Sequence, residues 1–91
     1  MKVAWTSKAV GDLARLHEFL ALVDQGAAAR VLQSLARVAG RLPAQPRLGE
    51  KLEQYEPREV RRVFAGKYEL RYEVQASQCI ILRVWHTRED R

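Results

Sequence analysis

The apolar residues of this chain change their spacing once, close to Pro43 and Pro46. Before these prolines the apolar residues recur every three or four positions, and after them they recur at every second position. The first spacing is typical of amphipathic helices, and the second is typical of strands covered on one face. Proline lacks the backbone N–H that a helix interior needs, so the helical part ends there. The sequence therefore predicts helices first and a sheet after them.

The helical part divides into two segments. A short extended stretch, "KVAW" at 2–5, precedes Thr6 and Ser7, either of which can cap a helix. Two apolar stripes follow, separated by "DQG" at 24–26; they are Val10, Leu13, Leu16, Leu20 and Val23, and then Ala28, Leu32, Leu35, Ala39 and Leu42. Helices joined by so short a connection pack antiparallel. We expect a first strand followed by a helical hairpin.

The part after the prolines predicts three strands. "AQPRLGEKLEQYEP" at 44–57 has no sustained period and reads as a loop. The strands are "REVRRVF" at 58–64, "KYELRYEVQ" at 67–75 and "CIILRVWH" at 79–86, with breaks "AGK" and "ASQ" that suit hairpin turns. Gly66 can supply a positive φ in the first turn. These strands form an antiparallel meander.

The order of elements predicts one α+β domain over residues 1–91, with the helical hairpin packed on one face of an antiparallel sheet. The middle strand alternates cleanly, so Tyr68, Leu70, Tyr72 and Val74 should face the helices, while Glu69 and Glu73 face outward. With regular registers, Val60 and Phe64 share one face of their strand with Arg61 opposite, and Ile80, Leu82, Val84 and His86 share a face towards the helices. The face left open then carries four cations: Arg61, Lys67, Arg71 and Arg83. We expect its glutamates to pair with arginines across strands.

The amino-acid composition indicates which kinds of binding partner and which cellular compartment to expect. Sixteen Lys and Arg against eleven Asp and Glu give a net charge of +5, which favours anionic partners. Because Cys79 is the single cysteine, the chain cannot form an internal disulfide. Its place in an apolar run predicts a buried thiol. The N-terminus lacks a signal peptide, and no apolar run is long enough to span a bilayer. His17 and His86 lack an acidic cluster, and no Gly-rich phosphate loop is present. We expect a cytoplasmic protein without metal, cofactor or membrane partner.

Four pieces of the chain, in this order and spacing, carry a resemblance: "VAWTSKAVGDLARL", "AAARVLQSLARVAGRLPAQPRLG", "REVRRVFAGKYELRYEV" and "IILRVWHTREDR". Together they resemble the RelE/ParE superfamily of bacterial toxins from type II toxin-antitoxin systems. The resemblance implies one of two activities. RelE-like members cut messenger RNA on the ribosome without metal, and ParE-like members inhibit DNA gyrase. Both kinds are held inactive by a cognate antitoxin.

An RNA-cleaving toxin needs a base, an acid and cations around the phosphate. By the resemblance to RelE-like members, His86 and Glu59 are the candidates for acid and base, with Arg61, Arg71 and Arg83 for the phosphate. Two features weigh against this role. A regular strand points His86 towards the helices and away from the arginines, and Glu69 and Glu73 would neutralise charge that a phosphate needs.

We therefore expect a ParE-like toxin that acts on DNA gyrase through protein contacts and is not an enzyme. The alternative is a ribosome-dependent mRNA endonuclease of RelE type, acting on the ribosome and mRNA, and a third possibility is a family member that retains only antitoxin binding. The expected partners are gyrase and an amphipathic, acidic antitoxin segment, which together make a hetero-oligomer. The helical hairpin and the tail "HTREDR" are expected contact surfaces. The expected contact residues are mostly basic: Arg58, Arg61, Arg62, Arg71, Arg83, Trp85, His86 and Arg88.

Overall fold

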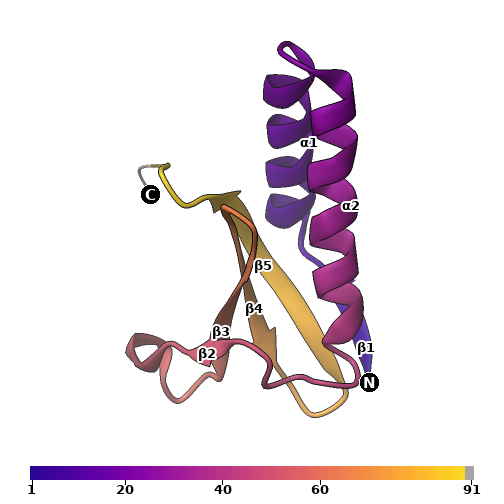
Figure 1. The fold of residues 1–91 in the computed structure, drawn as a ribbon. Coiled ribbons are helices and arrows are strands. Elements are labelled where there is room, and N and C mark those ends of the chain that lie inside the picture. Colours follow the sequence, from indigo (N-terminus) through magenta and orange to yellow (C-terminus); the bar gives the residue numbers. More distant parts are fainter. Residues whose placement is uncertain (90–91) are drawn as a thin grey trace.

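A helical hairpin leans against a twisted sheet in the computed structural model of the chain, which describes residues 1–89 (Figure 1). The elements are β1 (Lys2–Trp5), α1 (Ser7–Ala21), α2 (Gln25–Arg41), β2 (Glu50–Lys51), the 3₁₀ turn η1 (Glu53–Tyr55), β3 (Val60–Ala65), β4 (Tyr68–Val74) and β5 (Gln78–His86). The predicted α+β fold is confirmed. Asp90 and Arg91, at the end of the "HTREDR" tail, lie outside the described residues.

Side-chain caps begin both helices. The Thr6 hydroxyl accepts a hydrogen bond from the Ala9 N–H at 3.1 Å, and an Asp24 carboxylate oxygen accepts one from the Ala27 N–H at 3.2 Å. Such caps satisfy N–H groups that have no partner within the helix. The second helix consequently begins at Gln25, earlier than the apolar stripe predicts, because "DQG" is its cap and first turn.

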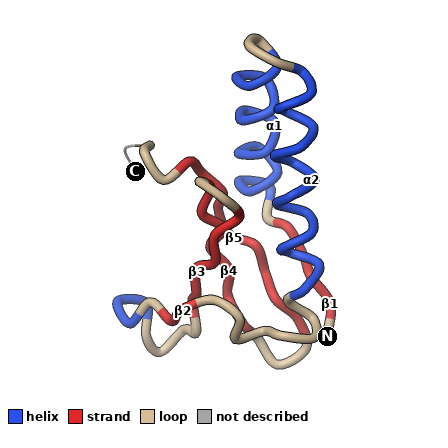
Figure 2. Tube along the Cα trace, viewed as in Figure 1, coloured by secondary structure: helices blue, strands red, loops and turns tan. Residues whose placement is uncertain are grey.

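The sheet has the strand order β1-β5-β4-β3-β2. Strands β3, β4 and β5 form the predicted antiparallel meander, but β1 runs parallel to β5, with Val3 opposite Cys79, so the sheet is mixed. The segment predicted as a loop at 44–57 adds the two-residue strand β2 and η1, seen beside each other in Figure 2. β1 pairs with a strand from the other end of the chain, and β2 is only two residues long, so local spacing reveals neither.

A register shift divides β5 into two halves. Arg83 lies opposite Arg71 and Ile81 lies opposite Tyr72, so Leu82 has no partner on β4. Such a bulge reverses the facing of every residue on one side of it. Cys79 and Ile81 are consequently buried in the core with Val84, as Cys79 was expected to be, and the predicted covered position of Ile80 is wrong.

Strand β3 also turns a different face outward than predicted. Arg61 lies opposite Tyr72 of the core, while Arg62 lies opposite Arg71 and Phe64 opposite Glu69. Because directly opposed residues share a face, Arg62 and Phe64 lie on the open face and Arg61 on the helical side. Lys67 belongs to the β3–β4 turn, where Gly66 has the expected positive φ of 60°. The prediction is therefore wrong for Arg61 and correct for Arg71 and Arg83.

The core lies between the sheet and the hairpin, and Tyr72 anchors the loop before β2 to it. Its hydroxyl donates to the Pro46 carbonyl at 2.8 Å and accepts from the Gly49 N–H at 2.9 Å. Gly49 passes so close to β3 that a Cβ there would lie 2.3 Å from the Arg62 carbonyl oxygen. Only glycine fits this crossing.

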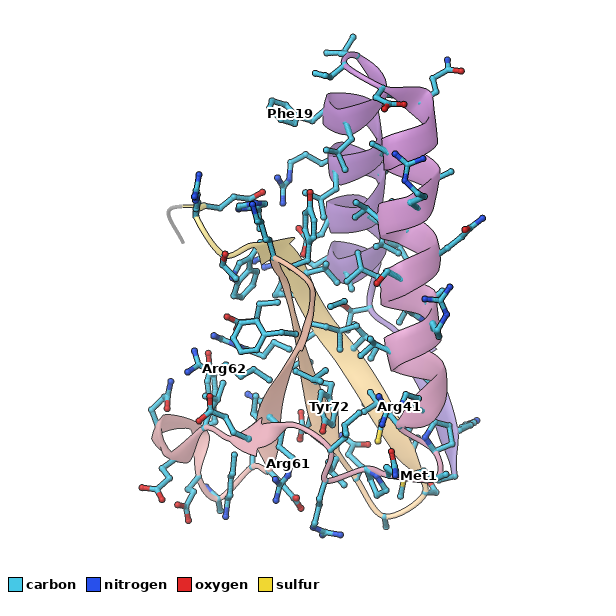
Figure 3. The ribbon with its side chains drawn as sticks, viewed as in Figure 1. Met1, Phe19, Arg41, Arg61, Arg62 and Tyr72 are labelled. Carbon is cyan, nitrogen blue, oxygen red and sulfur yellow. The ribbon has the colours of Figure 1, made fainter. Side chains whose placement is uncertain are left out.

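The hairpin extends beyond the sheet, so its outer end has no covering layer (Figure 1). Leu22 and Val23 are 87% and 83% exposed, and Phe19 is 69% exposed and projects away from the helices (Figure 3). The apolar stripe predicted Val23 to be buried, which is wrong, because the sheet ends before the helix does. We call Phe19, Leu22 and Val23 the hairpin tip.

Candidate functional site

A cleft of about 550 Å³ opens on the face of the sheet that the helices leave uncovered. We call it the open-face cleft. Its walls come from the start of α1, the loop before β3, and strands β4 and β5. Its charged lining consists of Lys8, Arg58, Arg71, Arg83 and Glu89, and its aromatic lining of Tyr55 and Trp85. Four cations therefore converge on one concave surface.

Trp85 forms the floor of this cleft beneath two arginines. The guanidinium carbons of Arg71 and Arg83 lie 4.9 and 5.5 Å from the centre of a Trp85 ring. Trp85 is only 6% exposed, and it lies on β5 beyond Ile81, where the pairing with β1 ends. The stack of cations on an aromatic face is a favourable arrangement. Trp85 therefore supports two of the cleft arginines.

Arg71 is held in place from several directions. Its guanidinium donates to Glu69 Oε2 from both Nε, at 3.1 Å, and Nη2, at 2.6 Å, and Nη1 donates to the Tyr55 hydroxyl at 2.9 Å. Arg58 pairs with Glu73 in the same way, through two donors at 3.3 and 2.8 Å. Glutamates on this face pair with arginines, as expected. Glu69 makes its short contact along its own strand with Arg71 and a longer one across strands with Arg62, at 3.9 Å.

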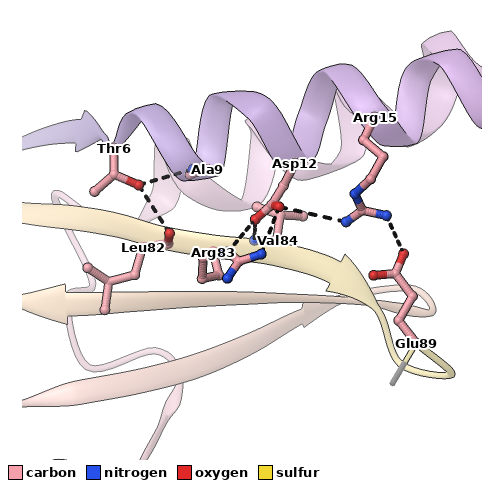
Figure 4. Close-up of polar contacts among 8 residues, drawn as sticks. All are labelled: Thr6, Ala9, Asp12, Arg15, Leu82, Arg83, Val84 and Glu89. Carbon is pink, nitrogen blue, oxygen red and sulfur yellow. Dashed lines mark hydrogen bonds and ion pairs between the residues drawn. The ribbon is translucent and has the colours of Figure 1, made fainter. Parts of the chain in front are cut away.

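Asp12 connects helix α1 to the strand that carries Arg83 (Figure 4). Its carboxylate accepts two hydrogen bonds from Arg83, at 2.9 and 3.1 Å, and a third from the Val84 N–H at 2.9 Å. Burial alone would raise the pKa of Asp12, but these bonds and the charges of Arg83 and Arg15 together hold it below its ordinary value. Asp12 is therefore ionised and keeps Arg83 fixed over Trp85.

A second cavity, of about 710 Å³, lies between α1 and the end of β5. Its floor and walls include Leu16, Phe19, Leu20 and Tyr68, and its polar rim consists of Arg15, His86, Arg88 and Glu89. A smaller hollow that also contains Tyr68 and His86 continues it towards α2, where Arg30, Val31 and Lys67 line it. We call the two together the hairpin groove. It combines an apolar floor with a mostly basic rim.

His86 belongs to this groove and not to the open-face cleft. It lies opposite Tyr68, with which it makes an edge-to-face contact at 5.1 Å, and its Nδ1 accepts a hydrogen bond from the Arg88 N–H at 3.0 Å. The expected orientation of His86 towards the helical side is thus confirmed. Arg88 also lines the groove.

Glu59 and Arg61 form a third, separate group. Arg61 donates to Glu59 at 2.8 Å and to the Gly49 carbonyl at 2.7 Å, and Arg47 donates to Glu59 at 3.1 Å. The hydrogen bond from Arg61 and the charge of Arg47 hold the pKa of Glu59 below its ordinary value, against a smaller opposing effect of burial. The five residues considered for RNA cleavage are therefore divided among three places: Arg71 and Arg83, His86, and Glu59 with Arg61.

The family follows from sequence comparison. A model described as "ParE toxin of type II toxin-antitoxin system, parDE" matches residues 3–91. The chain belongs to the ParE toxin family. The toxin is also similar in fold to a chain of the chromosomal ParDE toxin-antitoxin system from P. aeruginosa, with a TM-score of 0.76 and 21% identity over 94% of this chain and 95% of that one. No curated protein matches the sequence.

The expected contact residues of the toxin lie on different surfaces. Arg58, Arg71, Arg83 and Trp85 meet in the open-face cleft, and His86 and Arg88 lie in the hairpin groove. Arg62 is on the open face but outside the cleft lining, pairing with Glu50 at 2.6 Å and lying over Phe64. Arg61 is on the helical side. The eight expected contact residues therefore do not form one continuous surface.

Sequence reasoning missed Asp12, Lys8 and Tyr55 as parts of this architecture. Asp12 stands between Gly11 and Leu13 in the sequence, and this local pattern does not indicate a partner 71 positions away. Lys8 and Tyr55 join the cleft because the start of α1 and η1 come to the same side of the sheet. Within residues 1–89, no cluster of His, Cys, Asp and Glu could hold a metal ion, and no helix is both long and apolar enough to traverse a bilayer.

Proposed function

We propose that this ParE-family toxin inhibits DNA gyrase through protein contacts and that a cognate antitoxin neutralises it in the cytoplasm. The observation that carries the proposal is the match of residues 3–91 to the ParE family. The fold likeness to a chain of a ParDE system is consistent with it. The surfaces of the chain support binding in place of catalysis.

The separation of His86 from the arginines supports a protein that does not cut RNA. A general acid or base must reach the reacting group within hydrogen-bond distance while cations hold the phosphate. His86 and Arg83 lie on opposite faces of β5, and the carboxylate of Glu59 is occupied by Arg61 and Arg47. No observation on these residues favours the ribosome-dependent endonuclease.

The hairpin groove is the surface we propose for the antitoxin. An amphipathic helix laid into a groove contributes apolar anchors to the floor and polar residues to the rim. The floor here offers Phe19, Leu20 and Tyr68, and the rim offers Arg15 and Arg88. An antitoxin segment with apolar anchors and flanking acidic residues matches both, and it would cover the exposed Phe19.

A supercoiling and cleavage assay with purified gyrase tests the function. Toxin alone should inhibit supercoiling and trap cleaved DNA, and equimolar antitoxin should restore activity. Uninhibited gyrase in the presence of folded toxin would contradict the proposal. Cleavage of messenger RNA in a purified translation system, lost in His86→Gln, would replace it with the endonuclease.

A pair of substitutions on α1 tests the antitoxin surface. Phe19→Ser removes an exposed anchor of the groove, and Val10→Ser removes an exposed apolar residue on the same helix outside it. We expect Phe19→Ser to weaken antitoxin binding by at least about tenfold, as loss of a buried aromatic contact does. Val10→Ser should bind as the unaltered toxin does. Equal affinities of both variants would exclude the groove.

A further inference from the structure

The open-face cleft and the hairpin groove open on opposite faces of the sheet and meet at Glu89, which lines both. The antitoxin as proposed above occupies only the groove. We infer that the open-face cleft is the surface that holds the target, and that it takes a carboxylate-bearing segment of gyrase. This inference rests on the proposed function, because it names the site through which gyrase would be bound. It divides the toxin into one face for neutralisation and one for toxicity.

Donor groups in the cleft remain available after the internal ion pairs are made. Arg58 and Arg83 each use Nε and Nη2 for their own carboxylate partners, Glu73 and Asp12, and their Nη1 groups make no hydrogen bond within residues 1–89. Both side chains are about half exposed, at 52% and 44%. Lys8 is exposed, and it makes no ion pair with any described residue. These three groups point to an anionic occupant.

The N-terminal end of α1 adds to the positive electrostatic potential of the cleft. Thr6 and Lys8 line the cleft, and the first turn of the helix contains no acidic residue. Free N–H groups and the helix dipole favour negative charge at a helix N-terminus. The cation cluster and the helix end therefore attract the same kind of group.

Two features favour a protein carboxylate over a nucleic acid. First, single strands bind through bases stacked on exposed aromatic rings, but Trp85 is nearly buried and its face is covered by Arg71 and Arg83. Second, Asp12, Glu69 and Glu73 lie directly behind the cleft arginines and neutralise much of their charge. Binding to a phosphate backbone depends on such charge being unpaired. A protein segment with a few carboxylates could be bound by the three available donor groups alone, those of Lys8, Arg58 and Arg83.

The toxin offers a clean substitution to test this. Lys8→Glu reverses a charge in the cleft and breaks no ion pair with a described residue, and a carboxylate in the first turn of α1 is favourable to the helix. The matched control is Arg37→Glu, which makes the same change of charge at an exposed position of α2 outside both surfaces. A second test exchanges the partners of one pair, in the double variant Arg58→Glu, Glu73→Arg, which keeps the net charge.

The measurements are gyrase inhibition, antitoxin affinity and melting temperature for each variant. We expect Lys8→Glu and the exchanged pair to need at least about tenfold more toxin for half-inhibition. Arg37→Glu should stay within about twofold, and antitoxin affinity should be unchanged in all three, because the groove is untouched. Equal inhibition by Lys8→Glu and Arg37→Glu would overturn the inference and leave the proposed function standing. Inactivity of the unaltered toxin would overturn both.

A direct binding experiment distinguishes a protein ligand from a nucleic acid. Immobilised toxin should bind gyrase in the absence of DNA, and Lys8→Glu should weaken that binding. A fluorescein-labelled twelve-nucleotide single strand, of DNA or of RNA, should not bind. Oligonucleotide binding that Lys8→Glu abolishes would overturn the carboxylate assignment in favour of a nucleic acid. Loss of antitoxin affinity in Lys8→Glu would overturn the division into two faces.

Discussion

Asp12 shows how one buried carboxylate organises a binding surface. It is 5% exposed, yet three hydrogen bonds from Arg83 and the Val84 N–H compensate its burial. Without the Asp12 carboxylate, Arg83 would be free to turn away from Trp85. The Val84 N–H would also lose its hydrogen-bond acceptor. The position of a cleft arginine thus depends on a helix residue 71 positions earlier.

We expect Asp12→Asn to lower the free energy of unfolding by roughly 1–3 kcal/mol, since hydrogen bonds to a charged group are lost and Arg83 loses its direct ion-pair partner. Urea denaturation measures this. The control is Glu18→Gln, an exposed carboxylate on the same helix without an ion pair to any described residue, which should change stability by less than about 0.5 kcal/mol. Equal midpoints for both variants would contradict the role of Asp12.

Two glycines should respond oppositely to alanine. A Cβ on Gly49 would collide with the β3 backbone, so we expect Gly49→Ala to destabilise the toxin by about 1–3 kcal/mol or more. Gly40, inside α2, has nothing within 4 Å of an added Cβ, and Gly40→Ala should stabilise by about 0.5–1 kcal/mol. Thermal unfolding of the two variants gives the sign of each change. A stabilised Gly49→Ala would show that the loop before β2 can move.

At the scale of elements, α1 completes the edge of β5. Strand β1 pairs with β5 only as far as Ile81. Beyond that point the Thr6 hydroxyl donates to the Leu82 carbonyl at 3.0 Å and Asp12 accepts from the Val84 N–H. The side chains of a helix therefore replace a neighbouring strand at the bulge, and the bulge in turn brings Cys79 and Ile81 onto the covered face with Val84.

Thr6→Val should separate the hydrogen bonds of the Thr6 hydroxyl from the packing of its side chain. The variant keeps the volume but loses both the helix cap and the donor to Leu82, and we expect a loss of about 1–2 kcal/mol in unfolding free energy. Thr6→Ser, which keeps the hydroxyl, should retain most of the stability. Hydrogen exchange at Val84 and Trp85 should accelerate only in Thr6→Val. Unchanged exchange there would mean that the bulge holds without Thr6.

At the scale of the molecule, ion pairs link the two surfaces and make stability depend on pH. Bonds to arginine lower the folded-state pKa values of Asp12, Glu59 and Glu73 from ordinary values of 3.8 and 4.5. A lowered pKa contributes stability that is present above the unfolded pKa and is lost as pH falls through the folded pKa. We therefore expect constant stability from pH 7 down to about 5 and a decline below pH 4.5.

Denaturation midpoints at a series of pH values measure this decline. Asp12→Asn should flatten it, because one of the three carboxylates no longer titrates, and Glu18→Gln should leave the curve parallel to that of the unaltered toxin. High salt should reduce the part of the decline that comes from the exposed pairs. A stability that rises on acidification would contradict the assigned pKa directions.

Local spacing was sufficient for the fold class. The stripes of the two helices, the cap at Thr6, the alternation in Tyr68–Val74 and the turn at Gly66 each depend on residues close in sequence. The same alternation correctly assigned the outward position of Arg71. It also placed His86 on the helical side.

Only the tertiary structure decided how these pieces make a surface. The bulge at Leu82, the facing of Arg61 and Arg62 and the parallel pairing of β1 depend on strands that meet from distant parts of the chain. The open-face cleft likewise needs Lys8, Tyr55 and Asp12 to arrive beside β5. Periodicity reports which residues prefer to be buried, because that preference is local. It does not report which buried or charged groups become neighbours, because that is decided by long-range packing.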